Sequence, residues 1–255
     1  MYTIIKIPFD KCIVEKERRG TALGPESILK ELKFGILKNT NIIEVKELDD
    51  FEKMHKEVED IAKKENKKKN FVIGLGGDHS ISYGLMKAFA GSYKNTALIY
   101  FDAHLDCEDD FLPPTHEDIV RAAVNEKFFK PEDILIIGAR KFYPKELVFI
   151  KEKEIKLGRL EDIESFLKDK NNVYISLDID VFDPEFAPGT GYLENNGLKP
   201  EPVIQIIKKM MKTEKIRGID IVEVSPPKDK NNITVRLATE ILVEFLTNRA
   251  EKAFV

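Results

Sequence analysis

The segment Ala97-Leu98-Ile99-Tyr100-Phe101-Asp102-Ala103-His104-Leu105-Asp106 joins a continuous apolar run to a polar motif with two carboxylates and one imidazole. A short apolar run rich in β-branched and aromatic residues is typical of a strand buried in a parallel sheet. Similar runs recur along the chain, and longer segments with helical periodicity and charged faces lie between them. This alternation predicts an α/β fold with a parallel sheet.

The positions of these runs predict the individual elements. The predicted strands are Tyr2–Ile7, Ile42–Lys46, Phe71–Leu75, Ala97–Phe101, Asp133–Gly138, Glu154–Leu157, Val173–Leu177 and Arg217–Val222. Helices are predicted from Gly24 onward, from Lys199 to Met211, and over 49–66, 80–90, 117–127, 160–169 and 234–246. His55, in the predicted helix over 49–66, is expected at the charged surface. Because the chain has no linker-like segment, residues 1–255 are expected to form a single domain.

The composition excludes several classes of protein. The 255 residues carry a formal net charge of -4, which gives no long-range attraction for nucleic acid or for an anionic membrane. Two cysteines, Cys12 and Cys107, support neither a disulfide framework nor a Cys-based zinc site. The N-terminus lacks the pattern of a signal peptide, and no apolar run is long enough to span a membrane. We therefore expect a cytoplasmic protein.

Polar motifs follow three of the predicted strands directly. They are Gly76-Gly77-Asp78-His79-Ser80, the motif Asp102-Ala103-His104-Leu105-Asp106, and Asp178-Ile179-Asp180. Loops at the carboxyl ends of parallel strands converge, so these side chains are expected to share one cleft. Alternate residues of an extended chain point the same way, which places the two carboxylates and the imidazole of the second motif on one side. Such a group beside a buried run would be costly without a cation.

Together the motifs offer six ligand-type residues: His79, Asp102, His104, Asp106, Asp178 and Asp180. The set is rich in oxygen and contains no cysteine. It therefore suits a pair of Mn²⁺-like ions better than a structural zinc ion. Taken alone, the first motif is also an ordinary junction between a strand and a helix, with Asp78 or Ser80 as the N-cap.

The order of these motifs resembles the ureohydrolases, the family of arginases and agmatinases. The similarity continues through Ser176 to Gly191 and into Glu223-Val224-Ser225-Pro226, and so covers nearly the whole chain. It implies a three-layer α/β/α fold with an eight-stranded, mostly parallel sheet and two manganese ions. In such a site, two ions acidify a water molecule toward a pKa of ~7 and supply the hydroxide that attacks a guanidinium carbon.

The resemblance also assigns roles to residues. It implies that His79 and Asp106 bind one ion, that His104 and Asp180 bind the other, and that Asp102 and Asp178 bridge them. The predicted catalytic residues are Asp106, Glu223 and His116. Glu223 matches the glutamate that binds the substrate guanidinium, and a carboxylate can take that planar cation bidentately. His116 matches the loop histidine that passes a proton to the leaving amine, although Glu117 stands where the family has glycine.

A small cationic guanidino compound is the predicted substrate. Asp109 and Asp110, in the acidic loop after the second motif, are predicted to bind its cationic tail together with His116 and Glu223 at the guanidinium end. Agmatine, hydrolysed to urea and putrescine, is the first choice; arginine, aminopropylagmatine and guanidinobutyrate are alternatives. The stretch 192–197, Tyr192-Leu193-Glu194-Asn195-Asn196-Gly197, differs from the Pro-Glu-Pro-Gly-Gly-like segment of agmatinases and leaves the substrate open.

Two alternatives belong to other classes. Two-metal phosphoesterases also use an Asp-x-His motif, but they need a later Gly-Asn-His type segment and basic residues for the phosphate. An inactive, regulatory subunit with a ureohydrolase-like domain is the second, and the complete set of ligand-type residues argues against it. The resemblance further implies a homotrimer or a homohexamer.

Overall fold

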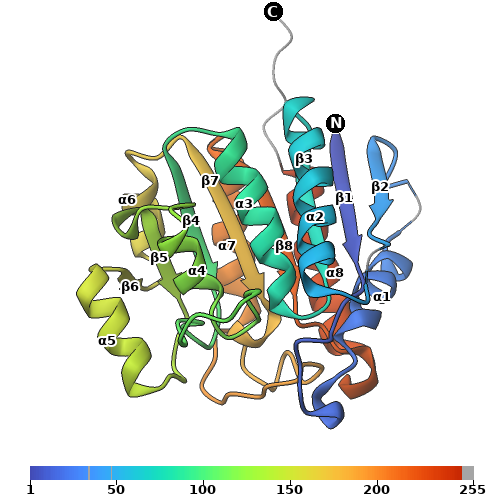
Figure 1. Cartoon of the computed structure of the whole chain (residues 1–255). Coiled ribbons are helices and arrows are strands. Elements are labelled where there is room, and N and C mark those ends of the chain that lie inside the picture. Colours follow the sequence, from blue (N-terminus) through green and yellow to red (C-terminus); the bar gives the residue numbers. More distant parts are fainter. Residues whose placement is uncertain (34, 47, 249–255) are drawn as a thin grey trace, which may run out of the picture.

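A computed structural model describes residues 1–33, 35–46 and 48–248. Its centre is an eight-stranded sheet with the order β2-β1-β3-β8-β7-β4-β5-β6 (Figure 1). Every neighbouring pair of strands is parallel. The strands are β1 (Tyr2–Ile7), β2 (Thr40–Glu44), β3 (Phe71–Gly76), β4 (Thr96–Phe101), β5 (Ile134–Ile137), β6 (Lys156–Gly158), β7 (Asn172–Asp178) and β8 (Ile216–Val222). The predicted eight-stranded α/β fold is confirmed, and each predicted strand is present.

Helices cover both faces of this sheet (Figure 1). They are α1 (Gly24–Glu31), α2 (Phe51–Lys67), α3 (Ser82–Ser92), α4 (Ile119–Asn125), α5 (Pro144–Lys153), α6 (Asp162–Leu167), α7 (Pro200–Met211) and α8 (Ile233–Thr247). Short 3₁₀ turns are η1 (Lys16–Arg18), η2 (Thr21–Leu23), η3 (His79–Ile81), η4 (Pro131–Asp133), η5 (Ile179–Val181) and η6 (Pro226–Lys228). Neighbouring residues such as Ile4 and Ile5 of β1 enter opposite hydrophobic clusters, one beneath α2 to α5 and one beneath α1, α6, α7 and α8. These two cores separate the three layers.

The strands that precede the three polar motifs and Glu223 are the four central ones. In the sheet order, β3, β8, β7 and β4 are consecutive. Their register pairs Phe101 with Leu177 and Asp178 with Val222, so the residues that follow these strands leave the sheet at about the same level. The carboxyl ends of the strands therefore bring the motifs together, as expected for a parallel sheet.

The helix α5 was not predicted from the sequence. Its buried side is short, with Phe149 and Ile150 as its buried apolar residues, so the helical periodicity is weak. A start signal is present, since Pro144 occupies the first turn and the Tyr143 amide donates to Glu146 Oε2 at 2.7 Å. The single domain predicted over 1–255 stays a prediction, because residues 249–255 lie outside the described residues.

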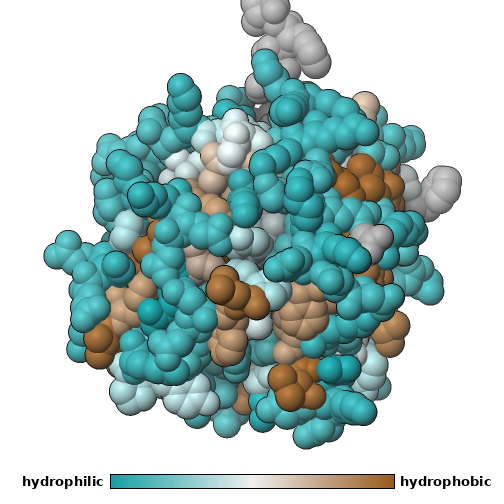
Figure 2. Space-filling model, viewed as in Figure 1, coloured by the Kyte–Doolittle hydropathy of each residue, from teal (hydrophilic) through white to brown (hydrophobic). Residues whose placement is uncertain are grey.

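The surface is mainly hydrophilic, with single large apolar residues such as Leu112 and Val14 exposed on it. Hydrophilic residues cover most of the face shown in Figure 2. Within the described ranges, no helix combines the length and apolar character needed to cross a membrane.

The expected surface position of His55 is wrong, because the residue is only 4% exposed. Helix α2 packs this side against α3, and the His55 ring lies 4.9 Å from the ring of Tyr83. Neither ring nitrogen has a hydrogen-bond partner within the part of the chain that is described. The sequence did not indicate this burial, because the residues around His55 in the sequence are charged.

We expect His55 to make stability depend on pH. Burial lowers the pKa of His55 from 6.5 to about 4, so the folded protein favours the neutral ring. The contribution of His55 to the free energy of unfolding is therefore fully present above pH 6.5. As the pH falls to 4, the free energy of unfolding decreases by about 3 kcal/mol through this residue. Urea denaturation of chelator-treated wild type and His55→Leu should give a smaller loss for the variant over this range. If the free energies of unfolding of wild type and His55→Leu changed equally with pH, the pH dependence would not come from His55.

Gly77 is required where the chain leaves β3. A Cβ built there would lie 1.7 Å from the Phe9 carbonyl oxygen, which belongs to the backbone and cannot move aside. Gly77→Ala should therefore lower the free energy of unfolding by at least about 3 kcal/mol. In Gly91→Ala, on α3, the nearest atom is the flexible Lys63 Cε at 3.3 Å, and a gain of roughly 0.5–1 kcal/mol is expected. Equal melting temperatures of the two variants would refute this account.

Candidate active site

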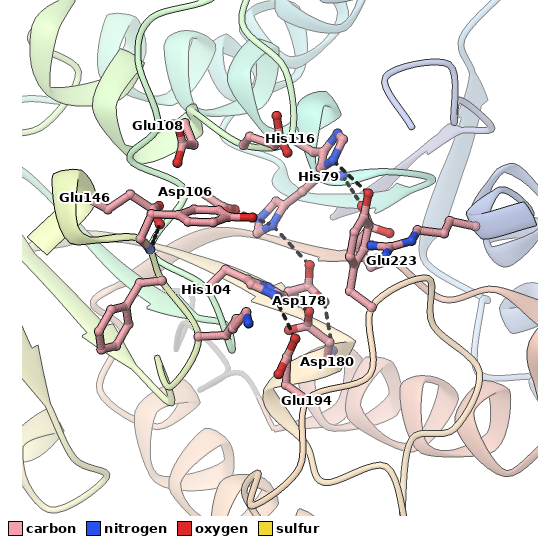
Figure 3. Close-up of a pocket in the computed structure, with 16 residues that line it drawn as sticks. His79, His104, Asp106, Glu108, His116, Glu146, Asp178, Asp180, Glu194 and Glu223 are labelled. Carbon is pink, nitrogen blue, oxygen red and sulfur yellow. Dashed lines mark hydrogen bonds and ion pairs between the residues drawn. The ribbon is translucent and has the colours of Figure 1, made fainter. Parts of the chain in front are cut away.

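The structure brings five of the six ligand-type residues into two adjoining groups, and the sixth, Asp178, lies beside the first group. His79, Asp102 and Asp106 form one group, and Asp102, His104 and Asp180 form the other; the possible ligand atoms in each lie within 4.8 Å of one another. Figure 3 labels five of the six ligand-type residues, which line one cavity at the ends of β3, β4 and β7: His79, His104, Asp106, Asp178 and Asp180. Asp102 belongs to both groups.

At the first group, its two carboxylates and that of Asp178 surround one imidazole nitrogen. His79 Nδ1 lies 3.0 Å from Asp102 Oδ2, 3.4 Å from Asp106 Oδ2 and 3.2 Å from Asp178 Oδ2. In the second group, His104 Nδ1 lies 3.2 Å from Asp102 Oδ1 and 3.0 Å from Asp180 Oδ2. The two oxygens of Asp102 thus face different histidines, which is the arrangement that a carboxylate bridging two ions requires.

The buried negative charges of these groups favour the binding of cations. Burial and neighbouring carboxylates raise the pKa of Asp106 and of Asp178 well above the ordinary value. The buried Asp102 Oδ2 has no hydrogen-bond donor among the described residues. Several buried carboxylates that repel one another are stabilised when divalent cations lie between them. Two imidazoles and four carboxylates therefore fit a pair of oxygen-preferring ions.

Two site residues have an uncommon backbone conformation. Asp106 has φ 47° and Glu223 has φ 62°, both in the left-handed region that non-glycine residues rarely adopt. The Glu223 amide donates to the Gly77 carbonyl at 2.8 Å, which ties the end of β8 to the turn after β3. Strain of this kind concentrates at functional sites, where the surrounding structure maintains it.

A buried hydrogen-bond chain orients His79. Its Nε2 lies 2.9 Å from Ser176 Oγ, and that hydroxyl donates to Asp220 Oδ1 at 2.8 Å. Asp220 also accepts from the Tyr174 hydroxyl at 2.8 Å. Because the Ser176 hydrogen is used by Asp220, Nε2 donates to Ser176 Oγ, which leaves Nδ1 as the nitrogen that can bind an ion among the carboxylates. This hydrogen-bond chain was not predicted from the sequence. It could have been found from the polar residues that interrupt two otherwise apolar strands, β7 and β8.

We expect Ser176→Ala to lower metal affinity by roughly 10- to 100-fold, because His79 then loses the partner that fixes its ring and its tautomer. Titration of the chelator-treated protein with Mn²⁺ would measure the change. Ser165→Ala removes an exposed hydroxyl on α6 and should leave the affinity unchanged. Equal affinities of Ser176→Ala and wild type would show that the chain does not support the site.

Two further supporting residues were also missed. The Tyr100 hydroxyl, on β4, donates to Asp106 Oδ2, and its ring stacks on His79 with centroids 4.9 Å apart. The Arg140 guanidinium donates to the carbonyls of residues 138, 180, 181, 182, 194 and 195. Arg140 therefore holds the loop of Asp180 against the loop that follows β5.

A pocket of about 320 Å³ opens above the two groups. Glu223 lines it and is 3% exposed; its Oε1 accepts from the His79 amide at 2.8 Å. Its Oε2 is buried and finds no partner in the described part of the chain. His116 lines the same pocket, and burial together with His79 and His104 lowers its pKa to about 4.

The structure places the remaining predicted contacts differently. Asp109 and Asp110 are not among the described residues that line the pocket. Asp109 is paired with Lys145 at 3.2 Å, and Asp110 accepts from the Asn125 amide at 2.9 Å. Besides Glu223 and the ligand-type aspartates, the acidic side chains that line the pocket are Glu108, Glu117, Glu146 and Glu194. The sequence could not predict which of these neighbouring acids faces the pocket, because the loop is irregular and its side chains do not alternate between two sides.

The comparison with known families agrees with this geometry. The model of the arginase family matches residues 1–247. The chain belongs to the arginase family. An arginase-family agmatinase from Neisseria meningitidis serogroup A is 30% identical over 96% of this chain and 86% of its own length. The crystal structure of an agmatine ureohydrolase of Thermoplasma volcanium has a TM-score of 0.85 at 28% identity, over 97% of this chain and 89% of the other.

A second curated relative in the arginase family matches over a shorter segment. The agmatinase of Bacillus subtilis is 31% identical over 70% of this chain, and the match spans 64% of that relative's length. The predicted resemblance to the ureohydrolases is thus confirmed at the level of the family and the fold.

Proposed function

We propose that this protein hydrolyses a guanidino compound to urea and an amine, with agmatine, cut to urea and putrescine, as the substrate. The single observation that carries this proposal is the unpartnered, buried Glu223 Oε2 beside the two ligand groups. Burial, and the charges of Asp178 and Asp78, raise the pKa of Glu223 well above the ordinary value. A planar cation that donates hydrogen bonds to this carboxylate would compensate both its charge and its missing partner.

The proposed cofactor is a pair of Mn²⁺ ions. His79, Asp106, Asp102 and Asp178 would hold one ion, and His104, Asp180, Asp102 and Asp178 the other. When bound, the two ions would supply a nucleophile at neutral pH by acidifying a water molecule. Glu223 would hold the guanidinium so that its carbon faces that nucleophile. His116 would give a proton to the amine nitrogen as the carbon–nitrogen bond breaks.

The outer part of the pocket favours a cationic tail. Its acidic lining residues, Glu108, Glu117, Glu146 and Glu194, outnumber the basic ones, Arg18 and Lys141. Burial and repulsion from Glu108 raise the pKa of Glu117, so a nearby ammonium group would stabilise its carboxylate. In this proposal Glu108 and Glu117 take the role that the sequence assigned to Asp109 and Asp110.

The assay that tests this proposal offers the Mn²⁺-loaded protein agmatine, arginine, aminopropylagmatine and guanidinobutyrate separately and measures urea. We expect agmatine to give the highest kcat/KM and a chelator-treated sample to give no urea. Arginine as the best substrate would overturn the choice of agmatine. Urea from none of the four, with manganese bound, would favour the inactive regulatory subunit instead.

Two further properties belong to the same proposal. One is assembly into a homotrimer or a homohexamer, which the family resemblance supports, and the other is a place in the cytoplasm. Light scattering of the purified protein would measure the oligomeric state, and a monomer would contradict it.

A further inference from the structure

Tyr192 lies where the sequence departs from the agmatinase-like pattern, and it lines the pocket. Its hydroxyl lies 3.4 Å from His116 Nε2, and the two rings are 5.8 Å apart at their centroids. The ring of His104, a member of the second ligand group, lies 6.0 Å away and edge-on. Tyr192 thus stands between the ligand groups and the proposed proton donor.

The two nitrogens of His116 have different surroundings. Nδ1 is buried and has no hydrogen-bond partner among the residues that the structure describes. Nε2 has the Tyr192 hydroxyl. A proton exchanged between this ring and the pocket would therefore pass at Nε2. A phenol can donate or accept, so Tyr192 can keep this contact whether or not Nε2 carries a hydrogen.

The phenol ring is itself held from its other side. The Arg18 guanidinium lies over the Tyr192 ring, 4.5 Å from its centroid. A Cβ at Gly191 would lie 3.1 Å from the Arg18 carbonyl oxygen, so the two backbones approach closely at this point. Burial, and the charges of Glu15 and Glu223, raise the pKa of Tyr192 to about 12, which keeps the phenol protonated at neutral pH.

We propose that Tyr192 is a positioning residue for His116: its hydroxyl holds the imidazole by Nε2, and Arg18 holds the phenol ring in place. The role rests on the proposed function, in which His116 protonates the leaving amine. It assigns a purpose to Tyr192 in the 192–197 stretch, because its hydroxyl supplies a partner to an imidazole that has no other among the described residues.

Tyr192→Phe removes only the hydroxyl and keeps the ring beneath Arg18. With the Mn²⁺-loaded protein and agmatine, or the best of the four substrates, kcat should fall roughly tenfold while KM stays within about twofold, as expected for one lost hydrogen bond. In a His116→Gln background, Tyr192→Phe should change kcat less than about twofold, because a residue that acts through His116 has no effect without it. Tyr83→Phe, which removes a hydroxyl bonded to Glu126 outside the pocket, is the matched control and should keep wild-type kcat.

A second readout is independent of turnover. The chain has 4 histidines, so the imidazole ¹⁵N resonances can be assigned by substitution. In the full chain without added metal, Tyr192→Phe should shift the Nε2 resonance of His116 and Tyr83→Phe should not. An unchanged resonance, an unchanged kcat, or additive losses in the double variant would overturn the role of Tyr192. If no substrate yields urea, the proposed function fails, while the His116 resonance still decides whether Tyr192 holds the ring.

Discussion

Asp178→Asn should abolish metal-dependent urea release while leaving the protein folded. Changes in residues that only support a metal ligand already cost roughly 10- to 100-fold in affinity, so loss of a charged, proposed ligand 3.2 Å from His79 Nδ1 should cost more than about 100-fold. The chelator-treated variant should melt no lower than wild type, because burial and the charges of Asp180 and Asp102 make the Asp178 carboxylate unfavourable without ions. Calorimetric titration with Mn²⁺, a urea assay and a thermal melt measure the three quantities.

Asp183→Asn is the matched control for this experiment. Asp183 lies in the same acidic segment, but its carboxylate accepts from the amides of Glu185 and Gly197 at 3.0 and 3.1 Å. The Asp183→Asn variant should retain manganese binding and urea release. A wild-type affinity for manganese in Asp178→Asn would exclude Asp178 as a ligand.

Glu223→Gln should separate substrate binding from metal binding. The amide oxygen can still accept from the His79 amide, so the backbone arrangement is kept, but the negative charge that faces the guanidinium is lost. Two hydrogen bonds to a charged group are worth roughly 1.5–3 kcal/mol each, so kcat/KM for agmatine should fall roughly 10²- to 10⁴-fold. Manganese affinity should stay within about threefold of wild type.

Steady-state kinetics and a manganese titration on the same preparation test this expectation. Glu201→Gln, on the exposed side of α7, controls for the loss of one acidic group from the chain. Wild-type kcat/KM in Glu223→Gln would remove Glu223 as the guanidinium anchor, and loss of manganese would instead assign it to the metal site.

The sequence predicted those features that follow from periodicity and from chain order. The inner strands were located because a strand inside a parallel sheet is apolar on both faces, as in Ala97–Phe101, whereas the largely exposed edge strands β2 and β6 lie at positions shifted from the predicted ones. The six ligand-type residues could be grouped because each lies just past such a strand, where parallel topology forces convergence. Helix α5 was missed because few of its apolar residues are buried, although Pro144 and Glu146 mark its start.

Features that depend on contacts between distant elements could not be predicted. His55 is buried because α2 packs on α3, and its local sequence is charged. Ser176 and Asp220 meet across β7 and β8, and Tyr192 meets Arg18 from the N-terminal segment. Glu108 lines the pocket in place of Asp109 because an irregular loop, and not an alternating strand, carries these acids.

The most direct test of the account is a crystal structure of the Mn²⁺-loaded protein with anomalous scattering measured at the manganese edge. We predict two anomalous peaks, one beside His79 and Asp106 and the other beside His104 and Asp180, with Asp102 and Asp178 between them. A single peak, or none at these side chains while manganese is present in the crystal, would contradict the two-ion site.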